Sequence, residues 1–444
     1  MIYIEINETK PKILFPEVTM LQPHRPFTIK AINCVGKAAK ALGFSFPSLR
    51  PKDIVAAALK RAGLKKEPGG ADKQSYMPGL EFLCGSLALE ANLTQIGRLV
   101  AHGTLKMSLA NRFVIDYLHE TNKEIRRQKV SAPLVIMGMA RTGTTFLHGL
   151  LSQDRSLFRS PLHHETMYPA PLIGGAGDGD ESLEGRRDKI ARDLQQFEKL
   201  CPNFGAFHKI TATTPEECVT IFQQDVMAQS LYITLNCPSY DRWMQDQDMS
   251  STMRHHRRLL QKDETKGNDP QRSRQWLLKT PQYLIMLGEL IMEYPDAEII
   301  WTHRPPKDVL ASLSAISTKL MGVVTDEIDP KNICKNVFVN TTSAIAKAMA
   351  TRKALERMGL GKRFCDVQFD RLCAQPMATV RRIYKHFGKK LEPDAEARMQ
   401  LYLKEHPRFK HGKPQYNIKD TFETNPDDLK LPPLDDYEAL YIKK

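Results

Sequence analysis

The chain has 444 residues, of which 41% are hydrophobic, so it can bury a large core and form one or more globular domains. Its 64 Lys and Arg against 51 Asp and Glu give a net charge of +13, which suits a polyanionic ligand, nucleic acid or an acidic membrane, and equally a solvated basic surface. The basic residues are spread along the chain without a run of five or six like charges, which argues against nucleic acid as a partner.

The first 130 residues are expected to form a mostly helical region. Residues 1–16 mix Glu and Lys with apolar residues, so they lack the unbroken apolar stretch of a signal peptide. Between residues 52 and 122, apolar residues recur at helical spacing, with a break at Gly69 and Gly70. No stretch of 18 apolar residues occurs, so the sequence predicts a cytoplasmic protein without a transmembrane segment.

From residue 131 the pattern changes to that of an α/β fold. Residues 132–138 form a short, continuous apolar run that is typical of a buried parallel strand, and a Gly-containing turn and a helix follow. Similar runs at 276–278, 298–302 and 364–369 are each followed by helical segments. We therefore expect a parallel sheet flanked by helices over residues 131–420, exposed loops at 174–181 and 262–274, and a surface-running tail over 421–444.

The turn after the first of these strands has the sequence of a phosphate-binding loop, Gly138-Met-Ala-Arg-Thr-Gly-Thr-Thr145. In a strand–loop–helix unit, backbone N–H groups and the positive end of the helix dipole converge on an anion, and threonine hydroxyls add donors. The loop nearly matches the GxxxxGK[ST] motif of nucleoside triphosphate-binding proteins, but Thr144 replaces the lysine that those proteins need beside the β- and γ-phosphates. A kinase or ATPase is therefore disfavoured, and Arg141 is the loop's cation.

A second phosphate-binding pattern follows the expected strand at 298–302. Arg304 comes directly after this strand, and Ser312 lies eight residues later, about two turns into the next predicted helix. The planar guanidinium group of an arginine makes bidentate, charge-assisted bonds to phosphate oxygens. The alternative is an arginine paired with a surface carboxylate.

Together these motifs resemble those of sulfotransferases that use 3′-phosphoadenosine-5′-phosphosulfate (PAPS). In that family the first motif binds the 5′-phosphosulfate and the second binds the 3′-phosphate. A third basic segment, residues 408–413, resembles the loop that closes over the 3′-phosphate in that family. The cofactor-binding residues that the resemblance implies are Arg141, Thr142, Gly143, Thr144, Thr145, Arg304, Ser312, Lys410, His411, Gly412 and Lys413.

The resemblance extends over about residues 50–420 and includes Glu165, Pro215-Glu-Glu217 and Leu277-Leu-Lys-Thr-Pro281. It implies the P-loop-like sulfotransferase fold with a helical N-terminal extension. It also implies transfer of a sulfuryl group from PAPS to a small acceptor such as an apolar alcohol, phenol or lipid. The sequence departs from the family at Pro305, which leaves Arg304 and Ser312 unaltered.

The resemblance and the chemistry together suggest five catalytic candidates. Sulfuryl transfer needs charge stabilisation, for which we select Arg141, and a base for the acceptor hydroxyl. His208 lies where the family has its acceptor-facing histidine and is the first candidate base, with Glu165 and Glu217 as rivals. The carboxylate of Glu217 is explained equally well by capping of a following helix. Lys279 could contact the transferring group or cap a loop.

No metal ion is expected. The eight cysteines are scattered without a Cys-x-x-Cys pair, which predicts free thiols in a reducing compartment rather than a zinc site or a disulfide framework. His163 and His164 are adjacent, so their side chains point apart, and no third ligand is evident.

Two other functions are compatible with the same motifs. The enzyme could sulfate a hydroxyl to activate it for elimination, or the chain could be a non-catalytic nucleotide-binding protein, because a fold alone does not establish an activity. Product mass distinguishes elimination from simple transfer, since a retained sulfate excludes elimination. No motif specifies the acceptor or the oligomeric state.

Overall fold

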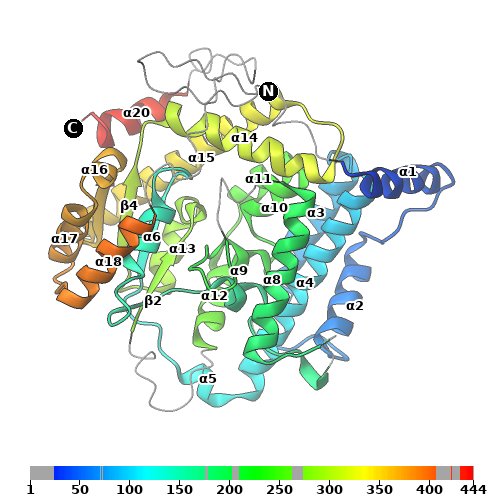
Figure 1. Cartoon of the computed structure of the whole chain (residues 1–444), viewed down its shortest axis with the longest axis horizontal. Helices are drawn as coiled ribbons and strands as arrows, with labels where there is room; N and C mark the ends of the chain where they lie inside the picture. The colour runs from blue at the N-terminus through cyan, green and yellow to red at the C-terminus, as the bar shows by residue number, and fades with distance from the viewer. Residues whose placement is uncertain are drawn as a thin grey trace, which may run out of the picture.

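The computed structural model describes residues 25–443 except 71, 73, 176–178, 203–209, 263–273, 407–421 and 423–430. Within these residues a parallel sheet lies among helices that cover both of its faces (Figure 1), which confirms the predicted α/β class with a helical N-terminal region. No helix in the described part of the chain is both long and apolar enough to cross a membrane.

The sheet has five strands in the order β2-β3-β1-β4-β5, and every pairing is parallel. In the central strand, Val135 pairs with Leu278 on one side and with Ile299 on the other. Four strands coincide with the predicted apolar runs, whereas the two-residue edge strand β2 has no such pattern. The strands are β1 (Leu134–Gly138), β2 (Phe158–Arg159), β3 (Gln275–Lys279), β4 (Glu298–His303) and β5 (Phe364–Gln368).

Alternate residues of β1 face two different hydrophobic cores. Leu134 and Ile136 belong to the core that includes α6 (Thr144–Leu151), α16 (Phe369–Ala374), α17 (Pro376–His386) and α18 (Pro393–Glu405). Val135 and Met137 belong to the larger core that includes α13 (Leu287–Glu293), α14 (Pro306–Val324) and α15 (Pro330–Arg357). Because successive side chains of a strand point to opposite faces, a sheet buried on both sides needs the continuous apolar runs found here.

The chain leaves β1 and β3 toward opposite faces of the sheet. The helix after β1, α6, packs on the smaller core, whereas the helix that follows β3, α13, packs on the larger core. In an open parallel sheet, such a change of direction creates a crevice at the carboxyl ends of the two strands. The fold therefore provides a binding site next to the predicted phosphate loop.

The N-terminal helices form a group beside the sheet domain (Figure 1). The long helix α4 packs along α2 and contacts α1, α12 and α14, so it joins this group to the sheet domain. The helices involved are α1 (Phe27–Ala41), α2 (Pro51–Ala62), α3 (Met77–Leu89), α4 (Gln95–Thr121), α5 (Lys123–Arg127) and α12 (Ser250–Gln261).

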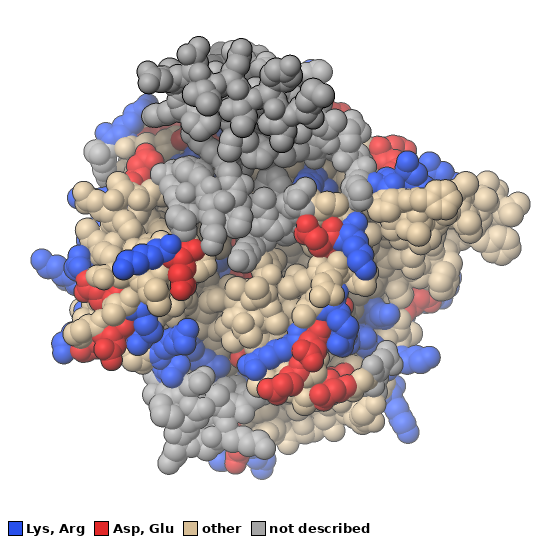
Figure 2. Space-filling view, in the orientation of Figure 1, with Lys and Arg blue, Asp and Glu red and all other residues tan. Residues whose placement is uncertain are grey.

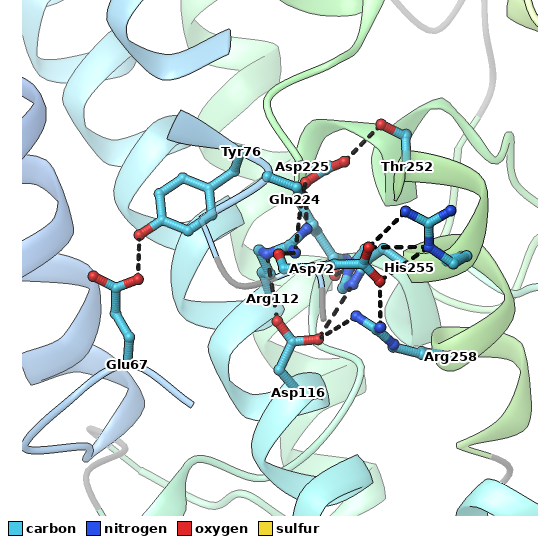
Figure 3. Close-up of polar contacts among 12 residues, drawn as sticks. Glu67, Asp72, Tyr76, Arg112, Asp116, Gln224, Asp225, Thr252, His255 and Arg258 are labelled. Carbon is cyan, nitrogen blue, oxygen red and sulfur yellow. Dashed lines mark hydrogen bonds and ion pairs between the residues drawn. The ribbon is translucent and has the colours of Figure 1, made fainter. Parts of the chain in front are cut away.

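A buried network of charges lies where α4 meets α12 (Figure 3). Arg112 of α4 forms ion pairs with Asp116 and with Asp225, whose side chain is fully buried. Asp72 and Asp116 both pair with Arg258 of α12. Buried charges are tolerated only when they are paired and hydrogen-bonded, so the network holds the helical region in one position on the sheet domain.

Shorter helices connect and cover these parts. They are α7 (His163–Met167), α8 (Leu183–Leu200), α9 (Val219–Gln223), α10 (Gln229–Leu235), α11 (Pro238–Gln245) and α20 (Pro432–Tyr441), with the 3₁₀ turns η2 (Ile173–Gly175), η5 (Pro281–Leu284) and η6 (Gly361–Arg363).

Helix α20 lies within the segment that the sequence predicts as a surface tail. Its Tyr437 is fully buried, with the hydroxyl 2.9 Å from Nδ1 of His303, and the ring of Tyr441 stacks on His303 with centroids 4.8 Å apart. The structure differs from the expectation because two aromatic rings, spaced one helical turn apart, pack against the end of β4 and cover it.

All eight cysteines are free thiols. Six are buried, whereas Cys373 is half-buried and Cys34 is exposed. Among the described residues, no group of three or more His, Cys, Asp and Glu side chains is arranged to hold a metal ion. On the face shown in Figure 2, Lys and Arg are interspersed with Asp and Glu rather than gathered into one basic stripe.

Candidate active site

The loop between β1 and α6 depends on two glycines. Gly138 has φ of +150°, and a Cβ at this position would lie 2.6 Å from the carbonyl oxygen of Thr302 in β4. Gly143 precedes α6 with φ of +88°. The hydroxyl of Thr142 donates to the Met139 carbonyl oxygen at 2.6 Å and lies 2.6 Å from the Thr302 hydroxyl. The loop is therefore fixed against the neighbouring strand before any ligand binds.

The loop leads directly into the beginning of α6. The first N–H groups of a helix have no partner within the helix, and the helix dipole makes this end positive. Thr144 is buried here, whereas Thr145 is exposed. Arg141 has φ of +68°, a region that non-glycine residues rarely adopt and that is common at binding sites. The backbone thus has the form of an anion-binding loop.

Arg304, at the end of β4, contacts this loop directly. Its Nη1 donates to the carbonyl oxygen of Arg141 at 3.1 Å, and its guanidinium group lies 4.3 Å from the ring centroid of Phe369. Its Nε is buried and has no hydrogen-bond partner among the described residues, and the carboxylate of Asp308 is 3.6 Å away. The structure therefore brings Arg141 and Arg304 into neighbouring positions, and Ser312 lies half-buried in α14, which follows Arg304.

Lys279 links the loop to a carboxylate. It ends β3 with 1% of its side chain exposed, and its Nζ lies 2.5 Å from Oε1 of Glu217 and 3.3 Å from the hydroxyl of Thr145. The backbone N–H of Cys218 donates to the carbonyl oxygen of Lys279 at 2.9 Å, which holds the Glu217 segment against β3. In place of capping α9, which begins at Val219, Glu217 pairs with Lys279.

Glu165 and the two histidines before it stabilise a local turn. The Glu165 carboxylate accepts a hydrogen bond from the Leu162 backbone N–H at 2.9 Å at the start of α7. His163 lies 3.4 Å from a carboxylate oxygen of Glu216, and Nδ1 of His164 lies 2.8 Å from the carbonyl oxygen of Ala212. Burial lowers the pKa of His164, partly offset by this hydrogen bond. Five predicted site residues lie outside the described residues, namely His208, Lys410, His411, Gly412 and Lys413.

The structure adds residues to the site that no sequence pattern indicates. His148 of α6 is buried beside Lys279, and burial together with the charge of Lys279 lowers the pKa of its imidazole to about 3. The ring is therefore neutral, with Nε2 3.1 Å from the Ser160 hydroxyl. His148 and Phe369 occur in ordinary helical sequence, and only the packing reveals that they support the loop and Arg304.

A cavity of about 200 Å³ opens next to the loop. Met139, Ala140, Glu217 and Thr280 line the side formed by the carboxyl ends of β1 and β3. Helices α9, α10, α11, α14 and α15 and the turn η5 form the remaining walls. The crevice that the topology predicts is therefore a cavity with an anion-binding loop on one side and the Lys279–Glu217 pair beside it.

Comparisons with known proteins agree with this geometry. A model of the sulfotransferase family matches residues 133–393. The fold is similar to the crystal structure of a sulfotransferase from Mycobacterium avium, with a TM-score of 0.74, 24% identity, and coverage of 90% of this chain and 99% of that one. A sulfotransferase structure from Mycobacterium tuberculosis has a TM-score of 0.69 and 25% identity, covering 88% of this chain and 98% of that one. A search of curated proteins gave no match.

Proposed function

The chain belongs to the sulfotransferase family, and from that membership we propose that it transfers a sulfuryl group from PAPS to a hydroxyl group of a small acceptor. The observation that supports the proposal most is the contact between the Arg304 side chain and the Arg141 backbone, with Lys279 on the same loop. Arg304 and Lys279 thus contact the same loop that carries Arg141, which supports binding of the separate anionic groups of one nucleotide by these three residues.

The chemistry of the loop fits the donor. A ligand with one 5′-phosphate, one sulfonate and one 3′-phosphate needs several separate cations and N–H donors rather than the lysine and metal ion of a triphosphate site. Within the part of the chain that the structure describes, the buried Nε of Arg304 has no hydrogen-bond partner. Most buried polar groups have one, so this atom is suited to a phosphate oxygen. We assign the 5′-phosphosulfate to residues 138–145 and the 3′-phosphate to Arg304 and Ser312.

The reaction that we propose is an in-line displacement at sulfur. The acceptor oxygen forms a bond to sulfur, the bond from sulfur to the 5′-phosphate oxygen breaks, and that oxygen keeps the electron pair. Arg141 and Lys279 stabilise the negative charge that develops there. Glu217 lines the cavity beside Lys279 and accepts the proton of the acceptor hydroxyl, with His208 as the rival base from the sequence.

Calorimetry with adenosine 3′,5′-bisphosphate tests the donor site. We expect binding by the parent protein and a loss of about 10- to 100-fold in Arg304→Ala, because a hydrogen bond to a charged group contributes about 1.5–3 kcal/mol. Arg357→Ala is the matched control, since Arg357 is exposed at the end of α15, before the amino end of β5. Absence of binding by the parent protein would refute the proposal.

Transfer from labelled PAPS, read by mass spectrometry, tests the base. Glu217→Gln should lower kcat by about 10²–10⁴-fold and remove the acidic limb of the pH profile, whereas His208→Asn should leave that limb in place. The reverse result would assign the proton transfer to His208.

A further inference from the structure

The walls of the cavity contain polar groups without partners. Apart from the loop and Glu217, the surface of the cavity is mostly apolar, with side chains such as Val219, Ile233, Leu313 and Val337, although about half of the lining residues are polar. Within it, several buried polar atoms have no hydrogen-bond partner among the described residues. They are Oγ of Ser230, the hydroxyl of Tyr232, Oδ1 of Asp241, Oγ of Ser317, and both Oδ1 and Nδ2 of Asn340.

Such a group of unpaired atoms is unusual in a protein interior. Native structures leave only a few buried polar groups unpaired per hundred residues, because each one costs about 1–3 kcal/mol. Unpaired buried atoms also occur elsewhere among the described residues, but six of them, from five side chains, line this one cavity, where a ligand can reach them.

Asp241 is the most distinctive member of this group. It lies in α11 with no exposed surface, and its Oδ2 accepts a hydrogen bond from Gln245 at 3.0 Å, while Oδ1 is unpaired. Burial raises the pKa of its carboxyl to about 7. The polar side chains of Gln245 and Gln229 and the charge of Arg242 act to lower this pKa but do not outweigh burial. No described cation forms an ion pair with it. Its oxygen is therefore ready to accept a hydrogen bond from a ligand.

Asn340 provides a second polar group on another helix. It lies within α15 with 5% of its surface exposed, and neither polar atom of its amide forms a hydrogen bond with another described residue. Helix α11 contacts α15 as well as α3 and α10, whereas the loop belongs to β1 and α6. The cavity therefore has one wall with the reactive groups and other walls with Asp241 and Asn340.

We propose that Asp241 and Asn340 recognise a second polar group on the acceptor, a hydrogen-bond donor that is either a hydroxyl or a protonated amine. This inference rests on the proposed function, in which the hydroxyl that becomes sulfated lies beside Glu217. The acceptor is thus an otherwise apolar molecule with polar groups at two positions, one of which reacts while the other determines specificity.

The size of the cavity limits the body of the acceptor. An apolar cavity of roughly 150 Å³ holds one benzene molecule, so a cavity of about 200 Å³ suits a single ring with a short side arm. Three phenols form a matched series of this size: 4-(2-hydroxyethyl)phenol, 4-(2-aminoethyl)phenol and 4-ethylphenol. They share the reacting phenol and differ in whether the arm ends in a hydroxyl, an ammonium group or a methyl group.

The test is calorimetry of each phenol with the full chain saturated with adenosine 3′,5′-bisphosphate. We expect at least one donor-bearing phenol to bind about tenfold or more tightly than 4-ethylphenol, because the latter leaves Asp241 and Asn340 unpaired. Asp241→Leu and Asn340→Leu should each reduce that preference to below about threefold while leaving the affinity for 4-ethylphenol similar. Asp241→Asn separates the two donors, because it should abolish a preference for the amine and retain one for the hydroxyl.

Asp246→Asn is the matched control, since Asp246 ends the same helix but is exposed and does not line the cavity. The melting temperature of each variant shows whether it is folded. Binding does not depend on turnover, so a preference without sulfuryl transfer would refute the proposed function alone. Three results would overturn the inference. They are equal affinity for all three phenols, a preference that survives both leucine variants, and no binding of either donor-bearing phenol at about 1 mM.

Discussion

Gly138→Ala tests whether the phosphate loop needs the exact backbone position that β4 imposes on it. The new Cβ would lie 2.6 Å from the carbonyl oxygen of Thr302 and 3.0 Å from the hydroxyl of Thr142, and the residue would keep φ of +150°. Overpacking against a strand costs about 1–3 kcal/mol. An alanine in this backbone region costs a further 1–3 kcal/mol or so. We therefore expect a loss of about 2–6 kcal/mol in the free energy of unfolding.

Urea unfolding gives the stability, and calorimetry with adenosine 3′,5′-bisphosphate gives the affinity, which should fall at least tenfold as the loop moves away from β4. Gly179→Ala is the control, because Gly179 has nearly the same φ, +154°, but no atom lies within 4 Å of the position of its Cβ. Both changes reduce the entropy of the unfolded chain equally. If the two variants lose the same stability and Gly138→Ala binds the nucleotide normally, the close approach of the loop to β4 has no role.

Four further predictions follow from other contacts. Arg112→Met should lower the free energy of unfolding by about 3–5 kcal/mol, because it leaves the fully buried Asp225 without its cation. In a double-mutant cycle measured by urea unfolding, adding Asp225→Asn should recover part of this loss. Although burial acts to raise it, His255, whose Nδ1 lies 3.9 Å away, and the charges of Arg112 and Arg258 hold the pKa of Asp116 at about 2, below the usual 3.8. The contribution of about 2 kcal/mol to stability is present above pH 4 and lost as the pH falls toward 2, and acid titrations of Asp116→Asn should lack that loss. Lys279→Met should reduce sulfuryl transfer by about 10²–10³-fold in a steady-state assay, because a cation that stabilises the developing charge is lost. The melting temperature should change little, because Glu217 is partly exposed and stays hydrated without Lys279. The carboxyl of Asp241 has a pKa raised by burial to about 7, so its cost to stability grows as the pH rises from 4 to 7, and Asp241→Asn should raise the melting temperature more at pH 8 than at pH 5.

The sheet could be predicted because its strands carry a local signal. Val135 and Ile136 face different cores, so a strand buried on both faces must be apolar at every position, and four such runs occur in the sequence. Strand β2 pairs through two residues only, so it is too short to show an apolar run in the sequence, although Phe158 is buried in the smaller core. Helix α20 was missed because its proline-rich start resembles a tail, whereas its burial depends on contacts with residues more than a hundred positions earlier.

The proposed donor site could be suggested from the sequence where chemistry and spacing occur together. Residues 138–145 and the spacing of Arg304 to Ser312 each lie within one strand–turn–helix unit, so sequence order determines their geometry. The pairing of Glu217 with Lys279 depends on two segments more than sixty residues apart, and the sequence suggested both residues without suggesting their contact. His148 and Phe369 gave no signal, because a histidine or phenylalanine that supports a cation looks like ordinary core.

Two equally buried aspartates differ in their hydrogen-bond partners, and this difference supports a ligand in the cavity. Asp225 and Asp241 both have no exposed surface. Asp225 is satisfied by Arg112, by the Ser75 hydroxyl at 3.0 Å and by the Thr252 hydroxyl at 2.6 Å. In contrast, one oxygen of Asp241 and the amide of Asn340 have no hydrogen-bond partner among the described residues. The chain can therefore surround a buried carboxylate with partners when its role is structural. Unpaired groups that reduce stability are expected where a binding site needs them, and both of these face the one cavity next to the phosphate loop.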